Sequence, residues 1–342
     1  MHAAYFRRHG GPEVMETGEA PEPVAAIGTV IVSVRAVALN HLDLWVRRGL
    51  PGLELDLPHI GGSDVAGVID EIGAGVEGWK VGDRVAVNPS LWCGECEWCE
   101  RGEQPLCVDF KILGEHVAGG TAERVRVPAR NLYRIPGDLG FRTAAAAPLA
   151  YQTAWRALKT RGGLKEGESV LVTGASGGVS TAAIQIARLL GARVLAVTSG
   201  SESVQRVREL GADVVFDRLE GEFTDGVREH TGGNGVELVL DSVGEATWTQ
   251  CLRSLSRLGR LVTYGATTGP RGNIEIRHMF WKQIAVSGST MATKAEFEAV
   301  MEHVAAGDLV PVIGSTMPLE AIRDAHEMLE EGRVFGKLVL EP

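Results

Sequence analysis

The stretch SVLVTGASGGVSTAAIQIARLLGARVLAVT, residues 169–198, decides the fold of this chain. It begins with a short apolar, β-branched run, Val170 to Val172, which is typical of a buried parallel strand. A glycine-rich turn follows, then apolar residues at helical spacing up to Gly191, and then a second apolar run from Val194 to Val197. We expect a βαβ unit whose helix N-terminus can bind a pyrophosphate.

The turn departs from the G-x-G-x-x-G pattern of dinucleotide-binding folds. Its three glycine positions are taken by Ala175, Gly177 and Ser180. Gly177 keeps the position where the backbone must approach a phosphate, and the other two residues are small enough for a tight turn. A strand, turn and helix without a ligand would give the same pattern, but the two flanking strands favour a dinucleotide site. The residues expected at the pyrophosphate are Ala175, Ser176, Gly177, Gly178 and Val179.

Length and charge narrow the class of protein. A chain of 342 residues exceeds one hydrophobic core, so two domains are expected. The net charge of −10 argues against a nucleic-acid or anionic-membrane partner. No apolar run approaches the roughly 18 residues of a membrane span, and the first residues, MHAAYFRRHGGPE, lack the apolar core of a signal peptide. We therefore expect a cytoplasmic protein.

The pattern of elements changes along the chain. Residues 1–130 contain short strands separated by glycine turns, which predicts a compact, barrel-like β body. Residues 143–148 and 151–158 have a helical pattern, and from residue 169 to about 286 strands and helices alternate, which predicts a doubly wound parallel sheet. The expected strands are 3–6, 29–38, 64–72, 84–87, 122–127, 170–173, 194–198, 214–216, 236–241, 260–264, 284–287 and 337–340, with a helix at 319–331.

Four of the five cysteines lie within fifteen residues, as C-x2-C-x2-C-x7-C. Thiolates at this spacing suit a tetrahedral zinc ion, and four protein ligands leave no open position for a substrate. We therefore predict one structural zinc rather than a secreted disulfide framework. The alternative is a set of unligated buried cysteines. The predicted ligands are Cys93, Cys96, Cys99 and Cys107, whereas Cys251 stands alone and is expected to be an ordinary buried residue.

Together these features resemble the medium-chain dehydrogenase/reductase superfamily over essentially the whole chain. The cysteine run is similar to the structural-zinc lobe of its alcohol dehydrogenases, whereas VTGASGGVS, LPHIGGSDVAG and ALNHLD resemble its quinone oxidoreductase branch. The resemblance implies an α/β protein with a GroES-like β-barrel catalytic domain, residues 1–135 completed by 290–342, and a Rossmann domain, residues 136–289. It also implies an active site in the cleft between the domains.

Departures from the family pattern bear on the chemistry. Where zinc alcohol dehydrogenases carry a catalytic Cys, a Gly-His-Glu and a further Cys, this chain has Asn40, Gly62-Ser63-Asp64 and the cysteine-free stretch 147–153, which contains Leu149. Amide, hydroxyl and aliphatic side chains are poor zinc ligands, so we predict that the catalytic metal is absent. Without this Lewis acid, an alkene conjugated to a carbonyl, or a quinone, remains reducible by hydride while hydrogen-bond donors stabilise the developing enolate. The predicted catalytic residues are Asn40, as a donor, with Asp43, Ser63 and Asp64.

Several side chains near these positions have two interpretations. Asp43 either fixes the asparagine loop or is a buried turn residue. His41 and His116 are proton donors or hydrogen-bonded structural histidines, and His116 could also be a remnant ligand. Trp45 stands where several quinone reductases of the family have a Tyr, and with Trp92 it either lines an apolar pocket or packs in the core.

The end of the second strand of the βαβ unit bears on the choice of nicotinamide. NAD-specific folds place an acid there, but Val197 is followed by a hydroxyl-rich turn that suits a 2′-phosphate. We therefore predict NADPH, with NADH as the alternative. The residues assigned to this end of the cofactor are Thr198, Ser199 and Arg206, and the resemblance adds Val243 near the nicotinamide ribose. Lys337 is also counted with the cofactor, because it resembles a residue that comes near the active site from the returning tail; the alternative is a solvated lysine at a strand end.

The leading hypothesis is an NADPH-dependent reductase of quinones or α,β-unsaturated carbonyls with one structural zinc and a small-molecule substrate. One alternative is an alcohol dehydrogenase with a metal site rebuilt from Asp64, His59 or His116, and another is a non-enzymatic NADPH-binding protein. The resemblance also implies a homodimer or homotetramer that pairs through the strand near residues 284–289.

Overall fold

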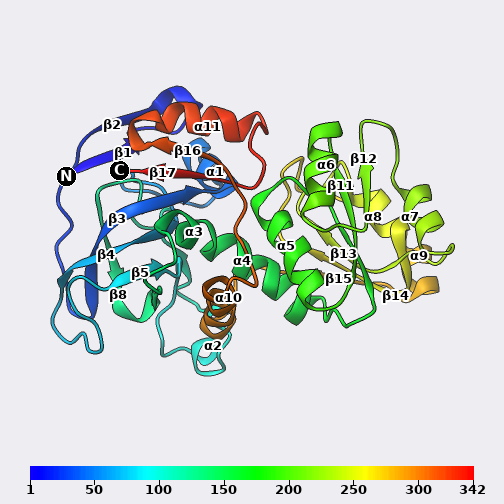
Figure 1. The fold of residues 1–342 in the computed structure, drawn as a ribbon, viewed down its shortest axis with the longest axis horizontal. Coiled ribbons are helices and arrows are strands. Elements are labelled where there is room, and N and C mark those ends of the chain that lie inside the picture. The colour runs from blue at the N-terminus through cyan, green and yellow to red at the C-terminus, as the bar shows by residue number, and fades with distance from the viewer. The chain divides into compact units, whose positions relative to one another are not determined.

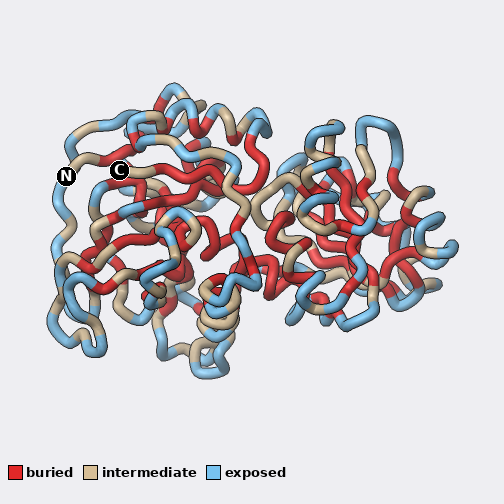
Figure 2. The backbone as a smooth tube through the Cα atoms, viewed as in Figure 1, coloured by how far each residue is buried: buried red, intermediate tan, exposed pale blue.

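The computed structural model describes residues 1–342 and divides into two compact units. The first unit comprises Met1–Ala150 with Ala292–Pro342, and the second comprises Tyr151–Met291. The sequence places the first boundary at residue 135. The structure places it fifteen residues later because helix α3, Phe141–Ala146, packs against strands β3 and β4 of the first unit. Figure 1 shows the elements, and Figure 2 shows a buried core inside each unit.

A seven-stranded sheet organises the first unit, in the order β16-β17-β3-β4-β5-β9, with β8 also pairing with β3. Most neighbours are antiparallel, and β16 with β17 is the parallel pair. The strands are β3 Thr29–Leu39, β4 Asp64–Ile72, β5 Arg84–Val87, β8 Arg124–Pro128, β9 Leu132–Arg134, β16 Ile313–Pro318 and β17 Lys337–Glu341. The last strand of the chain therefore lies between β16 and β3, so the C-terminal tail completes the sheet.

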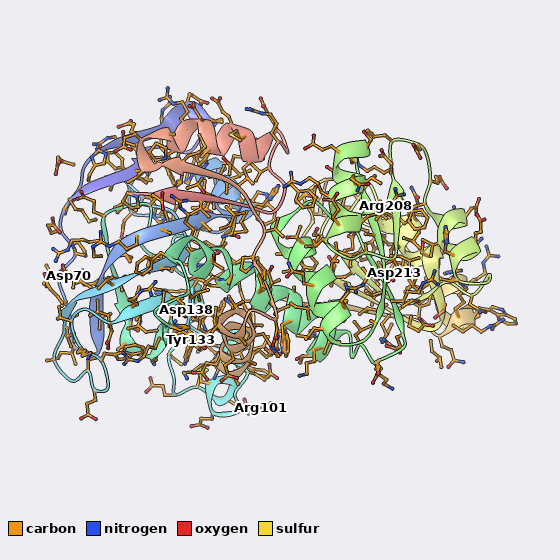
Figure 3. All side chains as sticks on the ribbon, viewed as in Figure 1. Asp70, Arg101, Tyr133, Asp138, Arg208 and Asp213 are labelled. Carbon is orange, nitrogen blue, oxygen red and sulfur yellow. The ribbon has the colours of Figure 1, made fainter.

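Smaller elements cover this sheet and form its lobe. The helices are α1 His41–Arg48, α2 Glu97–Glu100, α10 Lys294–Ala306 and α11 Ile322–Glu330. Two further pairs of strands are β1 His2–Phe6 with β2 Met15–Glu19, and β6 Ser90–Leu91 with β7 Lys111–Ile112. Helix α11 carries buried apolar residues on one face, and it packs on β2, β17 and α1. Tyr133 of β9 meets Phe297 of α10 edge to face, with ring centroids 6.2 Å apart, and Figure 3 labels Tyr133 beside that helix.

The second unit is built on a six-stranded parallel sheet in the order β12-β11-β10-β13-β14-β15. Numbered from β10, this is the order 3-2-1-4-5-6 of the doubly wound fold. The strands are β10 Ser169–Val172, β11 Arg193–Thr198, β12 Val214–Asp217, β13 Val236–Asp241, β14 Leu255–Thr263 and β15 Ala285–Gly288. The helices are α4 Pro148–Trp155, which begins in the first unit, and α5 Gly178–Leu189, α6 Ser201–Glu209, α7 Thr224–His230, α8 Trp248–Ser254 and α9 Ile276–Lys282.

The expected fold class, α/β with a Rossmann-type parallel sheet, is confirmed. The strand order changes direction between β10 and β13, and such switch points are where open α/β sheets bind ligands. The helix expected at 151–158 instead changes to a π-helical segment at Arg156–Arg161. No helix of the chain is both long enough and apolar enough to cross a bilayer.

Candidate active site

The loop after β3 is held by one buried carboxylate. Asn40 is the N-cap of α1, and its backbone N–H donates to Asp43 Oδ2 at 2.7 Å. The other oxygen of Asp43 accepts from the backbone N–H of Gly62 at 2.9 Å. Asp43 therefore joins the start of α1 to the segment before β4, which is the loop-fixing role. Burial raises the pKa of Asp43 to about 6, and the two backbone donors oppose that rise.

Asp64 is the centre of a polar cluster inside the first unit. Its side chain is 0% exposed, and its Oδ1 accepts from the backbone N–H of Leu149 at 2.7 Å. Its Oδ2 accepts from Asn40 Nδ2 at 3.0 Å and from Lys337 Nζ at 2.8 Å. The Lys337 ammonium also donates to Asn40 Oδ1 at 2.5 Å, and the lysine side chain is 3% exposed. A carboxylate and an ammonium thus form a buried ion pair that the Asn40 amide bridges.

Strand register explains why these residues meet. In the antiparallel ladder of β3 and β4, Ala38 pairs with Asp64, and in the ladder of β17 and β3, Leu338 pairs with Leu39. Lys337 therefore lies opposite Asn40 at the same end of the sheet as Asp64. From the sequence, Lys337 is expected at the cofactor. The structure instead places its ammonium against two residues predicted to be catalytic.

The hydrogen bonds of Asn40 change the role expected for it. Besides Asp64, its Nδ2 donates to the Ala38 carbonyl at 3.4 Å, and its Oδ1 accepts from Lys337. A carboxamide has two N–H donors, so both are used inside the protein. Asn40 is therefore not the free donor that the sequence analysis predicted. It positions Lys337 and Asp64.

Ser63 does not join this cluster. It is buried, and its hydroxyl has no hydrogen-bond partner in the structure. Ser63 lies just before the first residue of β4, and its hydroxyl makes none of the hydrogen bonds that hold Asp64. Both residues are predicted to be catalytic because they stand where the family has Gly-His-Glu, but in the structure only Asp64 contacts Asn40 and Lys337.

The histidines considered for a rebuilt metal site have structural partners. His59 Nε2 lies 3.0 Å from the Gly114 carbonyl oxygen and its ring packs against Phe6, whereas His116 Nδ1 accepts from the Ile112 N–H at 3.1 Å. His41 is exposed beside Asn40. The four-cysteine cluster is the one place in the chain where three or more potential metal ligands lie close together. The histidine rings therefore do not form a metal site with Asp64. Trp92 is buried beneath the Arg130 guanidinium, which fits core packing.

The four cysteines are arranged as a metal site. All four Sγ atoms lie within 4.8 Å of one another, and the separations are 3.8 Å for Cys93 and Cys99, 3.6 Å for Cys96 and Cys99, and 3.5 Å for Cys93 and Cys107. Tetrahedral zinc with Zn–S bonds of about 2.3 Å requires sulfur atoms about 3.8 Å apart. Backbone N–H groups of Cys93, Cys96 and Asp109 also point at these sulfurs. The cluster can therefore hold a zinc ion.

The cysteine lobe is organised locally by the short helix α2. Cys96 is its N-cap, Cys99 lies within it, and the next residue after it, Arg101, stacks its guanidinium 4.9 Å from the centre of the Trp98 ring. Figure 3 labels Arg101 at the outer end of this lobe. Residues 93–106 are all exposed or only partly buried, so few apolar contacts hold this loop.

The glycine-rich turn has the geometry of a phosphate-binding loop. The first hydrogen bond within α5 runs from Thr181 N to Gly177 O at 2.8 Å. The N–H groups of Gly178, Val179 and Ser180 come before it and therefore have no acceptor within the helix. Gly177 has φ −76°, and a Cβ atom there would meet only a carbonyl oxygen, at 3.4 Å. The fold itself does not require a glycine at this position, whereas the close approach of a pyrophosphate does.

Ser180 explains how the loop functions without its third glycine. Its hydroxyl donates to the Thr173 carbonyl at 2.9 Å, and it lies 3.0 Å from the Tyr264 hydroxyl at the end of β14. These bonds hold α5 close to β10. Val243 also lies next to this turn, because a Cβ atom on Gly174 would come within 3.3 Å of it.

The basic side chain that contacts the turn after β11 is Arg218, not the predicted Arg206. Arg206 lies on α6 with its guanidinium 4.0 Å from Glu202, while Arg218 Nε donates to Ser199 Oγ at 2.5 Å. The Thr198 hydroxyl is buried and has no partner. Sequence reasoning missed Arg218 because it follows β12. That strand pairs in parallel with β11 through Thr198 and Asp217, so the ends of the two strands are adjacent.

Comparison with known proteins agrees with this arrangement. Family models match residues 26–137, as an alcohol dehydrogenase GroES-like domain, and residues 178–306, as a zinc-binding dehydrogenase. The human quinone oxidoreductase is 33% identical over 99% of this chain and 97% of its own length, and the acryloyl-coenzyme A reductase of Sulfurisphaera tokodaii is 31% identical over 95% of both. The crystal structure of an NAD-dependent alcohol dehydrogenase superposes with a TM-score of 0.97, at 43% identity and full coverage of both chains.

The chain therefore belongs to the medium-chain dehydrogenase/reductase superfamily, and it is an oxidoreductase. Its two units are a GroES-like domain and a Rossmann-like domain. A nicotinamide cofactor and zinc are consistent with this family.

Proposed function

We propose that the protein reduces α,β-unsaturated carbonyl compounds or quinones with NADPH, and that it does so without a catalytic zinc ion. The observation that carries this proposal is the state of Asp64. Both oxygens of this carboxylate are already bound, one by the Leu149 backbone N–H and the other by Asn40 and the Lys337 ammonium.

A catalytic zinc ion does not fit these residues. Such sites supply three protein ligands and leave one position open. Here the three candidate positions supply the amide of Asn40, the hydroxyl of Ser63 and the aliphatic side chain of Leu149. The carboxylate beside them, Asp64, is paired with the buried Lys337 ammonium, which also contacts Asn40. A divalent cation would have to displace Lys337 against its positive charge. This argues against the alternative of an alcohol dehydrogenase with a rebuilt metal site.

Zinc has a structural place in the same proposal. Cys93, Cys96, Cys99 and Cys107 would hold it with four thiolates and no open position, so it would stabilise the lobe and take no part in the reaction. Cysteines that serve as metal ligands rather than as disulfides are typical of a reducing compartment, which is why we place the protein in the cytoplasm.

The loop of Gly177 and Gly178 would bind the cofactor's pyrophosphate, and the turn at Ser199 would bind the adenosine ribose. When bound, the reduced nicotinamide supplies a hydride. We assign NADPH because Arg218 presents a guanidinium at Ser199. The neighbouring carboxylate of Asp217 is occupied by the Gly200 and Leu219 N–H groups. NADH is the competing cofactor, since the solved structure at 43% identity is named for NAD.

A substrate panel tests the proposal. The purified, zinc-loaded protein is assayed for oxidation of NADPH and NADH with an enone, an enoyl thioester and a quinone, and in reverse with NADP and primary and secondary alcohols. We expect turnover of at least one activated alkene or quinone, a preference for NADPH, and negligible alcohol oxidation. Alcohol oxidation as the dominant activity would refute the proposed reaction, and a preference for NADH would refute the cofactor assignment. Cofactor binding without turnover of any of these substrates would favour the non-enzymatic alternative.

We propose a homodimer or homotetramer as the functional assembly. Strand β15 is at the edge of the Rossmann-type sheet, and the adjacent helix α9 exposes Ile276, Phe280 and Trp281. An open edge beside exposed aromatic side chains is suited to pairing with a second copy. Molar mass measured by light scattering should be at least twice that of the 36.5 kDa chain, and a monomer at assay concentrations would contradict this.

A further inference from the structure

The ammonium of Lys337 has one N–H donor left over. A lysine ammonium has three N–H groups. One is directed to Asn40 Oδ1 at 2.5 Å and one to Asp64 Oδ2 at 2.8 Å. A donor of a buried charged group is costly to leave without an acceptor, so the third N–H needs an oxygen from outside this set.

The surroundings of the ammonium do not offer another anion. Asp64 already accepts three bonds, one at Oδ1 from Leu149 N and two at Oδ2 from Asn40 and Lys337 itself. The carboxylate of Asp43 is directed to the backbone N–H groups of Asn40 and Gly62. Asn40 is 9% exposed and the next residue, His41, is exposed, so the surface of the unit begins one residue beyond the cluster.

We propose that Lys337 is a catalytic residue whose third N–H binds the oxygen of the substrate that becomes negative during the reaction. The assignment rests on the proposed reduction of enones or quinones. As a hydride adds to the β-carbon of the enone, the π electrons of the alkene move toward the carbonyl oxygen and produce an enolate. The Lys337 ammonium stabilises that oxyanion, and the α-carbon then takes a proton from solvent, so the lysine keeps its own proton.

Asn40 and Asp64 act as positioning residues in this scheme. Each uses one ammonium proton, so together they fix the direction of the third N–H without giving it a competing acceptor. Fixed donors of this kind stabilise a transition state because they need no reorganisation when charge develops. The buried ammonium thus supplies the electrostatic role that a catalytic cation has in zinc enzymes.

The experiment compares the full-length zinc-loaded protein with the double variant Lys337→Met, Asp64→Asn, which removes both charges and avoids a lone buried carboxylate. The first readout is the visible spectrum of para-nitrophenol bound to the protein, with and without NADP, at a pH well below the pKa of the free dye. We expect the wild-type protein to bind the dye as the phenolate and the double variant to bind it as the neutral phenol. The surface variant Lys294→Met is the matched control and should bind phenolate like the wild type, because Lys294 pairs only with Glu298 on α10.

The second readout is kcat/KM for the best activated alkene. We expect the double variant to lose about 10²–10³-fold, the effect of removing one oxyanion donor. In Lys337→Ala, added ethylammonium should restore part of the rate, whereas added tetramethylammonium, which has no N–H, should not.

Two results would overturn the role of Lys337: phenolate binding by the double variant equal to the wild type, or a kcat/KM within about threefold of it in a folded protein. A wild-type protein that reduces neither enones nor quinones would instead refute the proposed function, and the dye would still report whether Lys337 binds an oxyanion.

Discussion

The Lys337–Asp64 pair predicts a large and non-additive effect on stability. In Lys337→Met, the Asp64 carboxylate stays buried and keeps only its bonds from Leu149 N and Asn40 Nδ2. At the observed separation of 2.8 Å and an effective dielectric constant of about 20, the lost attraction is about 6 kcal/mol. The methionine avoids the cost of desolvating an ammonium, so the expected net loss is about 3–5 kcal/mol. For a unit of about 200 residues this lowers Tm by about 6–20 °C.

The assay is a double-mutant cycle. Thermal and urea unfolding are measured for the wild type, Lys337→Met, Asp64→Asn and the double variant, by circular dichroism and by intrinsic fluorescence. Each single variant leaves one buried charge without its partner, whereas the double variant leaves none. We expect the double variant to be more stable than either single variant, with a coupling energy of at least about 3 kcal/mol. Single effects below about 1 kcal/mol, or a double variant whose loss equals the sum of the two, would refute the buried ion pair.

Three further predictions concern other parts of the chain. Cys107→Ser should release the zinc and unfold the lobe, and metal analysis and limited proteolysis would detect these two effects. Retention of a full equivalent of zinc would contradict the four-thiolate site. Arg218→Ala should raise KM for NADPH by about tenfold and leave KM for NADH unchanged, while Arg206→Ala should change neither by as much; equal changes for both cofactors would contradict the assignment. Burial, and then the charge of Arg47, lower the pKa of His326 to about 3. Between pH 6.5 and 3 the ring is protonated in the unfolded chain but stays neutral in the folded one, so the free energy of unfolding falls as the pH is lowered through this range. The full decrease is up to about 5 kcal/mol, and none of it occurs above pH 6.5. His326→Asn, which keeps an acceptor for Arg47, should remove most of this pH dependence, and an unchanged slope would show that other groups cause it.

The fold was largely predictable because its signals are local. The strands of the second unit are short β-branched runs, and β10, β11 and β13 fall within a residue of their expected limits. The cysteine cluster and the glycine-rich turn are likewise contained in short segments. Helix α3 was assigned to the wrong unit, since a helical pattern does not indicate which sheet the helix covers.

The candidate site was less predictable because it depends on register. Lys337 and Asn40 are 297 residues apart in the chain, and only the pairing of β17 with β3 brings them into contact. The residue types at positions 40, 63 and 64 indicated poor zinc ligands, but nothing in them showed that a lysine lies among them. Arg218 was missed for the same reason, since it reaches Ser199 only because β12 lies beside β11.

The most direct test of the whole account is the zinc content of the purified chain, measured together with reductase activity before and after brief treatment with a chelator. We predict one zinc per chain, absent from Cys107→Ser, with reduction of an enone or quinone that survives removal of loosely bound metal. A second zinc that disappears in Asp64→Asn, together with alcohol oxidation that is lost on chelation, would contradict the account. That result would mean that Lys337 yields its place to a catalytic metal.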